Sequence, residues 1–141
     1  MAVKTEKIKL NKFGLKKVVG VRMTMGQYDR MEELSIKLLE QEQYYLQHAD
    51  EMTPLDGILS EKENKQAMCS FIQDAFSLTD DEMATIFDSV NPAQFNEAFD
   101  YVTSRMRGLT DAEYNLAVEK EKRRLAEENE DPKADSVESA D

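Results

Sequence analysis

The sequence is poor in the residues from which many catalytic and metal centres are built. Its 141 residues include one cysteine, Cys69, and one histidine, His48. A single cysteine excludes an intrachain disulfide, and it predicts a packed core thiol in a reducing compartment. A lone histidine with no cysteine beside it cannot supply a zinc site or a Ser/His/Asp triad. The five glycines form no phosphate-binding loop. We therefore expect no enzyme, no metal and no cofactor.

Long apolar runs are also missing. Nowhere does the chain reach the run of about 18 apolar residues that a membrane helix needs. Its first residues, "MAVKTEKIKLNKFG", lack the apolar core of a secretory signal. The sequence thus predicts a soluble protein with no membrane partner that is not secreted by this signal. Because 40% of the residues are hydrophobic, the chain can still bury a single core.

Positive charge is concentrated at the start of the chain. Residues 1–22 hold seven basic groups and one acid, a net +6, whereas the remainder holds 11 basic groups and 28 acids, a net −17. A basic head of this kind suits an anion, a nucleic acid or the acidic body of a second copy. Nucleic acid is the weaker choice because the acidic body would repel phosphates. We expect no nucleic-acid partner, and self-association through five basic residues: Lys9, Lys12, Lys16, Lys17 and Arg22.

The hydrophobic pattern predicts a mainly α fold. In residues 1–23, alternating "KIKL", the reversal "NKFG" and valine-rich "LKKVVGVRM" indicate a β-hairpin. The apolar residues expected on its covered face are Ile8, Leu10, Val19, Val21 and Met23. From residue 24 the period becomes helical, which predicts a bundle of about five to six helices and then a disordered acidic C-terminal tail. We accordingly divide the chain into a basic hairpin packed on the helices or on a neighbour (1–23), a helical domain (24–126) and the tail (127–141).

Helix starts recur with one chemical pattern. "FSLTDDEMATIF" contains three consecutive carboxylates, which suggests either a metal or acid/base site or the first turn of a helix. Thr79 and Glu82 have the spacing of a capping box, with Leu78 and Met83 as its hydrophobic staple. Similar spacing occurs at other expected helix starts, so we interpret the cluster as a cap. The predicted caps are Thr24, Ser60, Thr79, Asn91 and Thr110. After the break at "HADEMTPLDG" we expect at most a short helical turn before the helix that Ser60 would cap.

The order of these features resembles a known family. A basic hairpin precedes a long helix in "MTMGQYDRMEELSIKLL". The aromatic helix "MCSFIQDAF" then leads at once into "SLTDDEMATIFDSV", "FNEAFDYVTSRM" and an acidic end. Over about residues 7 to 107 this sequence resembles the tail assembly chaperones of long-tailed (siphovirus-type) bacteriophages.

The resemblance implies a non-enzymatic role. Such chaperones coat the tape measure protein before the tail tube assembles around it, then leave. It therefore implies the tape measure protein, and also the tail tube protein, as partners, self-association into a spiral, location in the host cell cytoplasm and absence from the mature virion. The competing function is a small helical adaptor that binds a single protein without polymerising. Seven apolar residues are predicted either to face the partner or to close the monomer core: Met31, Leu34, Leu38, Phe95, Phe99, Val102 and Met106.

Overall fold

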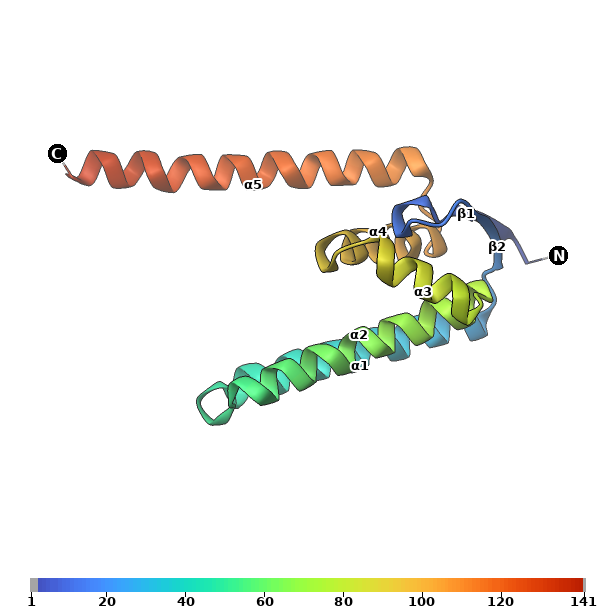
Figure 1. Ribbon diagram of the computed structural model, residues 1–141. Helices are drawn as coiled ribbons and strands as arrows, with labels where there is room; N and C mark the ends of the chain where they lie inside the picture. The colour runs from blue at the N-terminus through green and yellow to red at the C-terminus, as the bar shows by residue number, and fades with distance from the viewer. Residues whose placement is uncertain (1–2, 141) are drawn as a thin grey trace. The chain divides into compact units, whose positions relative to one another are not determined.

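In the part of the chain that the structure describes, five α-helices and a two-stranded antiparallel sheet make up the fold (Figure 1). The computed structural model describes the backbone of residues 3–140 and the side chains of residues 3–129. This confirms the prediction of a mainly α fold behind an N-terminal hairpin. The elements are β1 (Thr5–Lys9), a short 3-10 helix η1 (Asn11–Phe13), β2 (Val18–Arg22), α1 (Met25–Gln47), η2 (Ala49–Glu51), α2 (Pro54–Phe76), α3 (Asp80–Ser89), α4 (Pro92–Met106) and α5 (Asp111–Ala140).

The chain divides into two compact units, Met1–Arg107 and Gly108–Asp141. The first unit holds the hairpin together with α1 to α4, and the second holds α5. The unit boundary therefore lies before α5, whereas the boundary predicted after residue 126 lies inside that helix.

The hairpin buries the predicted face. Its register pairs Ile8 with Val19 and Glu6 with Val21. Four of the five expected apolar residues are buried, namely Ile8, Leu10, Val19 and Val21. The fifth, Met23, is half-buried because it lies beyond the end of β2.

Glu6 also lies on the covered face, because residues directly opposite in an antiparallel pair point to the same side. The Glu6 carboxylate lies 3.4 Å from the Arg105 guanidinium of α4, and both side chains are only 12% exposed. Arg105 Nη2 also donates to the Lys7 carbonyl at 2.9 Å. An ion pair therefore accompanies the apolar contacts that hold the hairpin.

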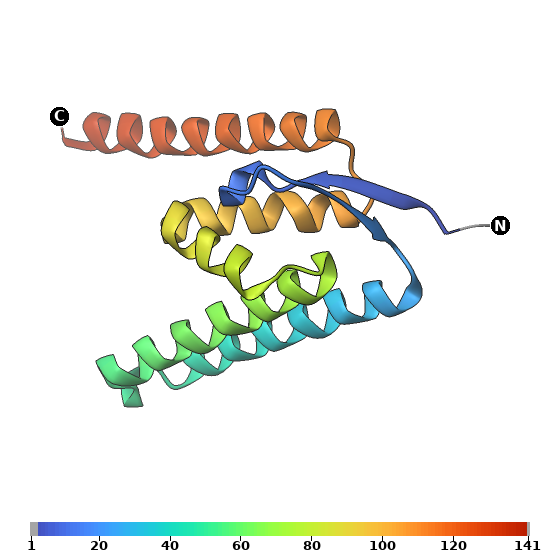
Figure 2. The same cartoon turned by 45° about the vertical axis from the view of Figure 1, so that its right-hand side comes forward.

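Phe13 anchors the hairpin on the helices. Gly14 reverses the chain with φ +89°, a left-handed conformation that glycine adopts without cost. The Phe13 ring has no exposed surface, and its centroid lies 5.4 Å from that of Phe95 in α4. Both η1 and β1 contact α4, and β2 contacts α2 (Figure 2). The hairpin is thus part of the core of the first unit.

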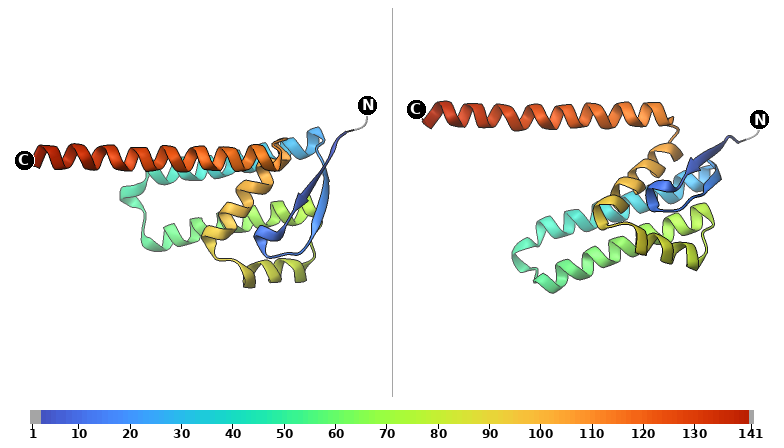
Figure 3. Two further views of the ribbon diagram at one scale, coloured as in Figure 1. Left: turned by 90° about the horizontal axis from the view of Figure 1, so that it is seen from above. Right: turned by 45° about the horizontal axis from the view of Figure 1, so that its top comes forward.

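The α1 and α2 helices form an antiparallel helical hairpin. Each is 23 residues long, and the turn that joins them includes η2 (Figure 3). Their inner ends carry the buried side chains Met31, Phe71, Ile72 and Phe76. Their outer ends, near η2, extend past the rest of the first unit. Only part of each helix is therefore covered by α3, α4 and the β-hairpin.

The helix start predicted at Ser60 is wrong. α2 begins at Pro54, so Ser60 lies inside the helix. Thr53 is the true cap: its hydroxyl accepts from the Asp56 N–H at 3.2 Å, and its own N–H donates to the Asp56 carboxylate at 3.0 Å. Gly57 favoured the prediction of a break, but a glycine inside a helix lowers stability by only about 1 kcal/mol relative to alanine. A good cap followed by Pro54 at the first helical position therefore outweighs one glycine.

The acidic end belongs to α5 in the described backbone. α5 runs to Ala140 and so includes most of residues 127–141, for which the sequence predicts disorder. Side chains beyond residue 129, and residue 141, lie outside the described residues, so this disorder stays a prediction. Within the part that is described, no helix combines the length and apolarity required to cross a bilayer.

Cys69 is a buried free thiol of α2, as predicted. Burial raises the pKa of this thiol, and the nearby Lys65 charge opposes that rise. A raised pKa keeps the sulfur protonated and weakly nucleophilic near neutral pH.

Candidate functional site

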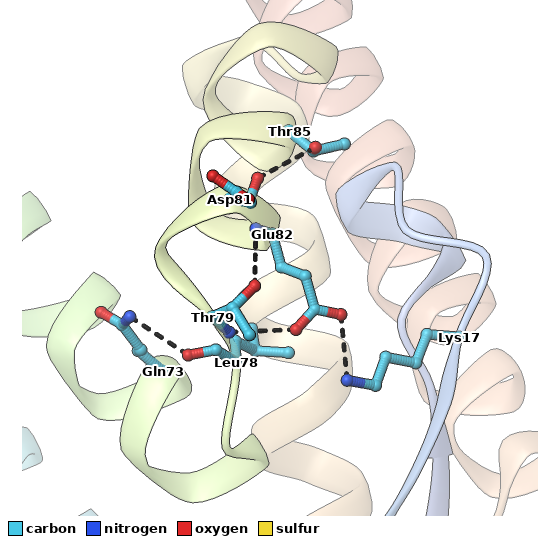
Figure 4. Close-up of polar contacts among 7 residues, drawn as sticks. All are labelled: Lys17, Gln73, Leu78, Thr79, Asp81, Glu82 and Thr85. Carbon is cyan, nitrogen blue, oxygen red and sulfur yellow. Dashed lines mark hydrogen bonds and ion pairs between the residues drawn. The ribbon is translucent and has the colours of Figure 1, made fainter.

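The carboxylate cluster at residues 79–82 forms the start of α3. The Thr79 hydroxyl accepts from the Glu82 N–H at 3.1 Å, and the Thr79 N–H donates to the Glu82 carboxylate at 3.0 Å (Figure 4). Lys17, from the end of the hairpin loop, donates to the other Glu82 oxygen at 2.9 Å. One carboxylate of the cluster, that of Glu82, is therefore engaged in a capping box and in an ion pair with the hairpin.

The neighbouring acids also have structural roles. Gln73 of α2 donates to the Leu78 carbonyl at 3.1 Å and to the Asp80 carboxylate at 3.0 Å. Asp81 accepts from the Thr85 hydroxyl through its backbone carbonyl (Figure 4). Leu78 is buried, consistent with its expected role in a hydrophobic staple. Among the described side chains, no group of three or more His, Cys, Asp or Glu is placed to hold a metal ion.

Replacing Thr79 with alanine should lower the free energy of unfolding by about 1 kcal/mol, because one N–H at the helix start loses its partner. Urea denaturation followed by circular dichroism measures this change. Thr79→Ser keeps the hydroxyl and should stay closer to the wild type. If Thr79→Ala abolished metal binding and left stability unchanged, the cluster would be a metal site instead of a cap.

The same cap should make stability depend on pH. The Thr79 backbone hydrogen bond, followed by the Lys17 hydrogen bond, lowers the pKa of Glu82 below its usual range. The stabilisation is therefore present above about pH 4.3, the usual pKa of glutamate, and is lost as pH falls through the lower folded-state pKa. Glu82→Gln can keep the cap without titrating, so its stability should fall less on acidification. Equal acid sensitivity of the two proteins would contradict this assignment.

Three other predicted caps are confirmed. The Thr24 hydroxyl accepts from Gln27 at 3.2 Å. Asn91 and Gln94 exchange hydrogen bonds at 2.8 and 2.9 Å. The Thr110 hydroxyl accepts from the Glu113 N–H at 3.1 Å, and the Thr110 N–H donates to the Glu113 carboxylate at 3.0 Å. Because the same hydrogen-bond pattern recurs at separate helix starts, it is better explained as helix capping than as a reactive centre.

The residues predicted either to face a partner or to close the core fall into two groups. Met31, Phe95, Val102 and Met106 are at most 9% exposed, so they fill the core of the first unit. Leu34, Leu38 and Phe99 are half-buried. The Phe99 ring packs near Phe71 and Phe95, with centroids 6.1 and 6.4 Å away. The structure therefore favours the core alternative for the first group.

The predicted self-association residues lie on or near the hairpin. Lys9, Lys16 and Arg22 are exposed. Lys12 is exposed as well, and its ammonium lies 5.5 Å from the centre of the Tyr101 ring. Lys17 is partly engaged by Glu82. Lys9, Lys16 and Arg22 are thus the exposed cations that suit an intermolecular contact best.

A second group of apolar residues was not predicted from the sequence to be exposed. We name residues 36–59, the outer ends of α1 and α2 with their turn, the arm. Of the 15 exposed large hydrophobic side chains in the described part, eight lie in these 24 residues. They are Ile36, Leu39, Tyr44, Tyr45, Leu46, Leu55, Ile58 and Leu59. This concentration of exposed apolar side chains makes the arm a candidate interaction surface.

A signal for the arm was present in the sequence. Apolar residues occur on more than one face of the helix around Ile36, Leu39 and Leu46, whereas a helix covered on one side needs a single stripe. On this helix, partner or core contacts are predicted from the sequence only for Met31, Leu34 and Leu38. The second set faces away from the core.

Sequence comparison agrees with the assembled features. The family model for phage tail assembly chaperone proteins (TAC) matches residues 6–123. This range covers the hairpin, α1 to α4 and the first part of α5. No curated protein and no solved structure matches the chain.

Proposed function

Because the chain belongs to the phage tail assembly chaperone proteins, we propose that it binds the tape measure protein during tail assembly and acts without catalysis. The observation that supports this most directly is the arm, whose eight exposed large hydrophobic side chains suit a helical protein partner. Binding would shield apolar surface on both proteins until the tail tube assembles. The tail tube protein is the second proposed partner.

We further propose that copies of the chain associate through opposite charges. The basic head, residues 1–22, carries a net +6, and the remainder carries a net −17. A contact between the head of one copy and the acidic body of the next is heterologous, so it can extend into an open spiral. The protein would act in the host cell cytoplasm and would bind neither a membrane nor nucleic acid. It would be absent from the mature virion.

Charge reversal on the hairpin tests self-association. The triple variant Lys9→Glu/Lys16→Glu/Arg22→Glu should elute as a single chain in size-exclusion chromatography with light scattering. The wild type should form larger species at low ionic strength and lose them as salt screens the contact. Lys17 and Lys12 stay unchanged because they contact Glu82 and Tyr101.

The matched control reverses three exposed charges on α5, in Lys120→Glu/Lys122→Glu/Arg123→Glu. It changes the net charge equally, so it should keep the larger species if the hairpin is the contact. A wild type that remains a sharp monomer at high concentration and low salt would favour the adaptor alternative, provided that it still binds the tape measure protein. Failure to bind any tail protein of its phage would contradict both functions.

A further inference from the structure

Four exposed apolar side chains of α1 lie on one face of the helix: Tyr28, Ile36, Leu39 and Leu46. An open groove of about 470 Å³ is lined mainly by this face, including Tyr28, Met31, Glu32, Ile36 and Leu39. Positions three, four, seven and eight apart lie on the same side of an α-helix. The groove is therefore elongated along α1, which is the shape that accepts another helix.

The apolar surface continues beyond the groove into the outer part of the arm. Leu46 is seven residues after Leu39, so it extends the same face by two turns, and it is 70% exposed. On α2, Leu55 and Ile58 are 62% and 63% exposed. A short loop could fill the groove alone, whereas covering the groove and Leu46 requires a partner several helical turns long.

The charge of the arm determines what kind of helix fits. The arm contains five acids and one lysine, a net −4. Glu32 and Arg107 line the groove as one acid and one base, so together they leave this net charge unchanged. Pairing two arms would bring these like charges together, which opposes association. The hairpin of a second copy is basic, but in its described part, from residue 3 onward, the exposed large hydrophobic side chains are Val3 and Val18, too few to cover this surface.

We propose that the arm binds a basic amphipathic helix of the tape measure protein. The apolar face of that helix would cover Leu39 and Leu46, and lysine or arginine side chains at its edges would lie near the acids of the arm. This inference rests on the proposed function for the identity of the partner. The chemistry of the bound helix follows from the groove and the arm.

The first test uses synthetic peptides and the full chain. An 18-residue peptide with leucine on one helical face and lysine elsewhere should bind the wild type in isothermal titration calorimetry. A scrambled peptide of the same composition, and a peptide with glutamate in place of lysine, should bind at least tenfold more weakly. Equal binding of the scrambled or the acidic peptide would overturn the proposal.

Two double variants locate the site. Leu39→Gln/Leu46→Gln should weaken binding of the leucine/lysine peptide at least tenfold. Phe87→Gln/Leu125→Gln removes two exposed apolar side chains outside the arm, 58% and 46% exposed, and should bind like the wild type. Neither variant changes the charge, so a difference between them cannot come from the attraction of a basic peptide to an acidic protein. Equal peptide affinity of the two variants would overturn the proposal.

Co-purification separates this inference from the proposed function. Each variant is expressed with the tape measure protein of the same phage, and the retained fraction is measured. Retention by the wild type and its loss in the arm variant support the proposal. Retention by both shows that the tape measure protein binds elsewhere, which overturns the inference and leaves the function standing. If the wild type binds the peptide through the arm but never retains the tape measure protein, the function is overturned.

The same variants test a second copy as the occupant. Sedimentation of the arm variant should show the same self-association as the wild type. If the arm variant became monomeric while its affinity for the peptide was unchanged, the arm would be an interface between copies and the proposal would be wrong.

Discussion

Phe13→Ala should lower the free energy of unfolding by about 3–5 kcal/mol, the cost of removing a fully buried phenylalanine. The Phe13 ring has no exposed surface, and it packs against the Phe95 ring at a centroid distance of 5.4 Å. Because a domain is stabilised in total by about 5–15 kcal/mol, this single change removes a large part of the stability. Urea denaturation followed by circular dichroism measures it.

The control for this prediction is Phe87→Ala in α3. Phe87 is 58% exposed, so its removal should change stability by no more than about 0.5 kcal/mol. Hydrogen exchange adds a regional readout, since the amides of β1 and β2 should lose protection in Phe13→Ala before those of α1 and α2. Equal destabilisation by the two substitutions would show that the hairpin is not anchored through Phe13.

Gly14→Ala should have the second largest effect, because it combines two penalties. Gly14 has φ +89°, where a β-carbon costs roughly 1–2 kcal/mol. The new methyl group would also overlap the Ser89 side chain at the end of α3. The hairpin loop must then shift away from α3, so the loss should exceed the backbone penalty alone. The free energy of unfolding is again the measured quantity.

A second glycine separates these two penalties. Gly108 has φ +103°, and nothing lies within 4 Å of the position that its β-carbon would take. Gly108→Ala should therefore show the backbone penalty without the overlap. Ser89→Gly, introduced into Gly14→Ala, should recover part of the lost stability, and the double-mutant cycle measures the interaction. If Gly14→Ala cost no more than Gly108→Ala and gained nothing from Ser89→Gly, the close packing of the loop on α3 would be contradicted.

Much of the local structure could be predicted from the sequence because its causes are local. Thr79 and Glu82, or Asn91 and Gln94, satisfy backbone groups three residues away, so spacing alone predicts the helix start. The alternation of charged and apolar residues is also a local pattern, and it placed Ile8 and Val19 on the covered face of the hairpin. The error at Ser60 was also local: two helix-start signals lay close together, and Gly57 was given more weight than the Thr53 cap.

The surface that we propose as the binding site for a partner could not be predicted in the same way. A stripe of apolar residues on a helix indicates that the face is covered, but it does not say by which protein. Met31 and Phe95 are covered by the chain itself, whereas Leu39 and Leu46 are not. That difference depends on how far α1 and α2 extend past the elements that pack against them.

The sequence by itself determined four of the five helix starts, the hairpin and the family, since each depends on the kind and order of residues close together in the chain. Only the tertiary structure decided which apolar side chains remain exposed in the arm, and that Glu6 pairs with Arg105 across 99 positions of the sequence. The physical reason is that burial and ion pairing depend on distances between residues that the fold brings together, and residue spacing along the chain does not encode those distances.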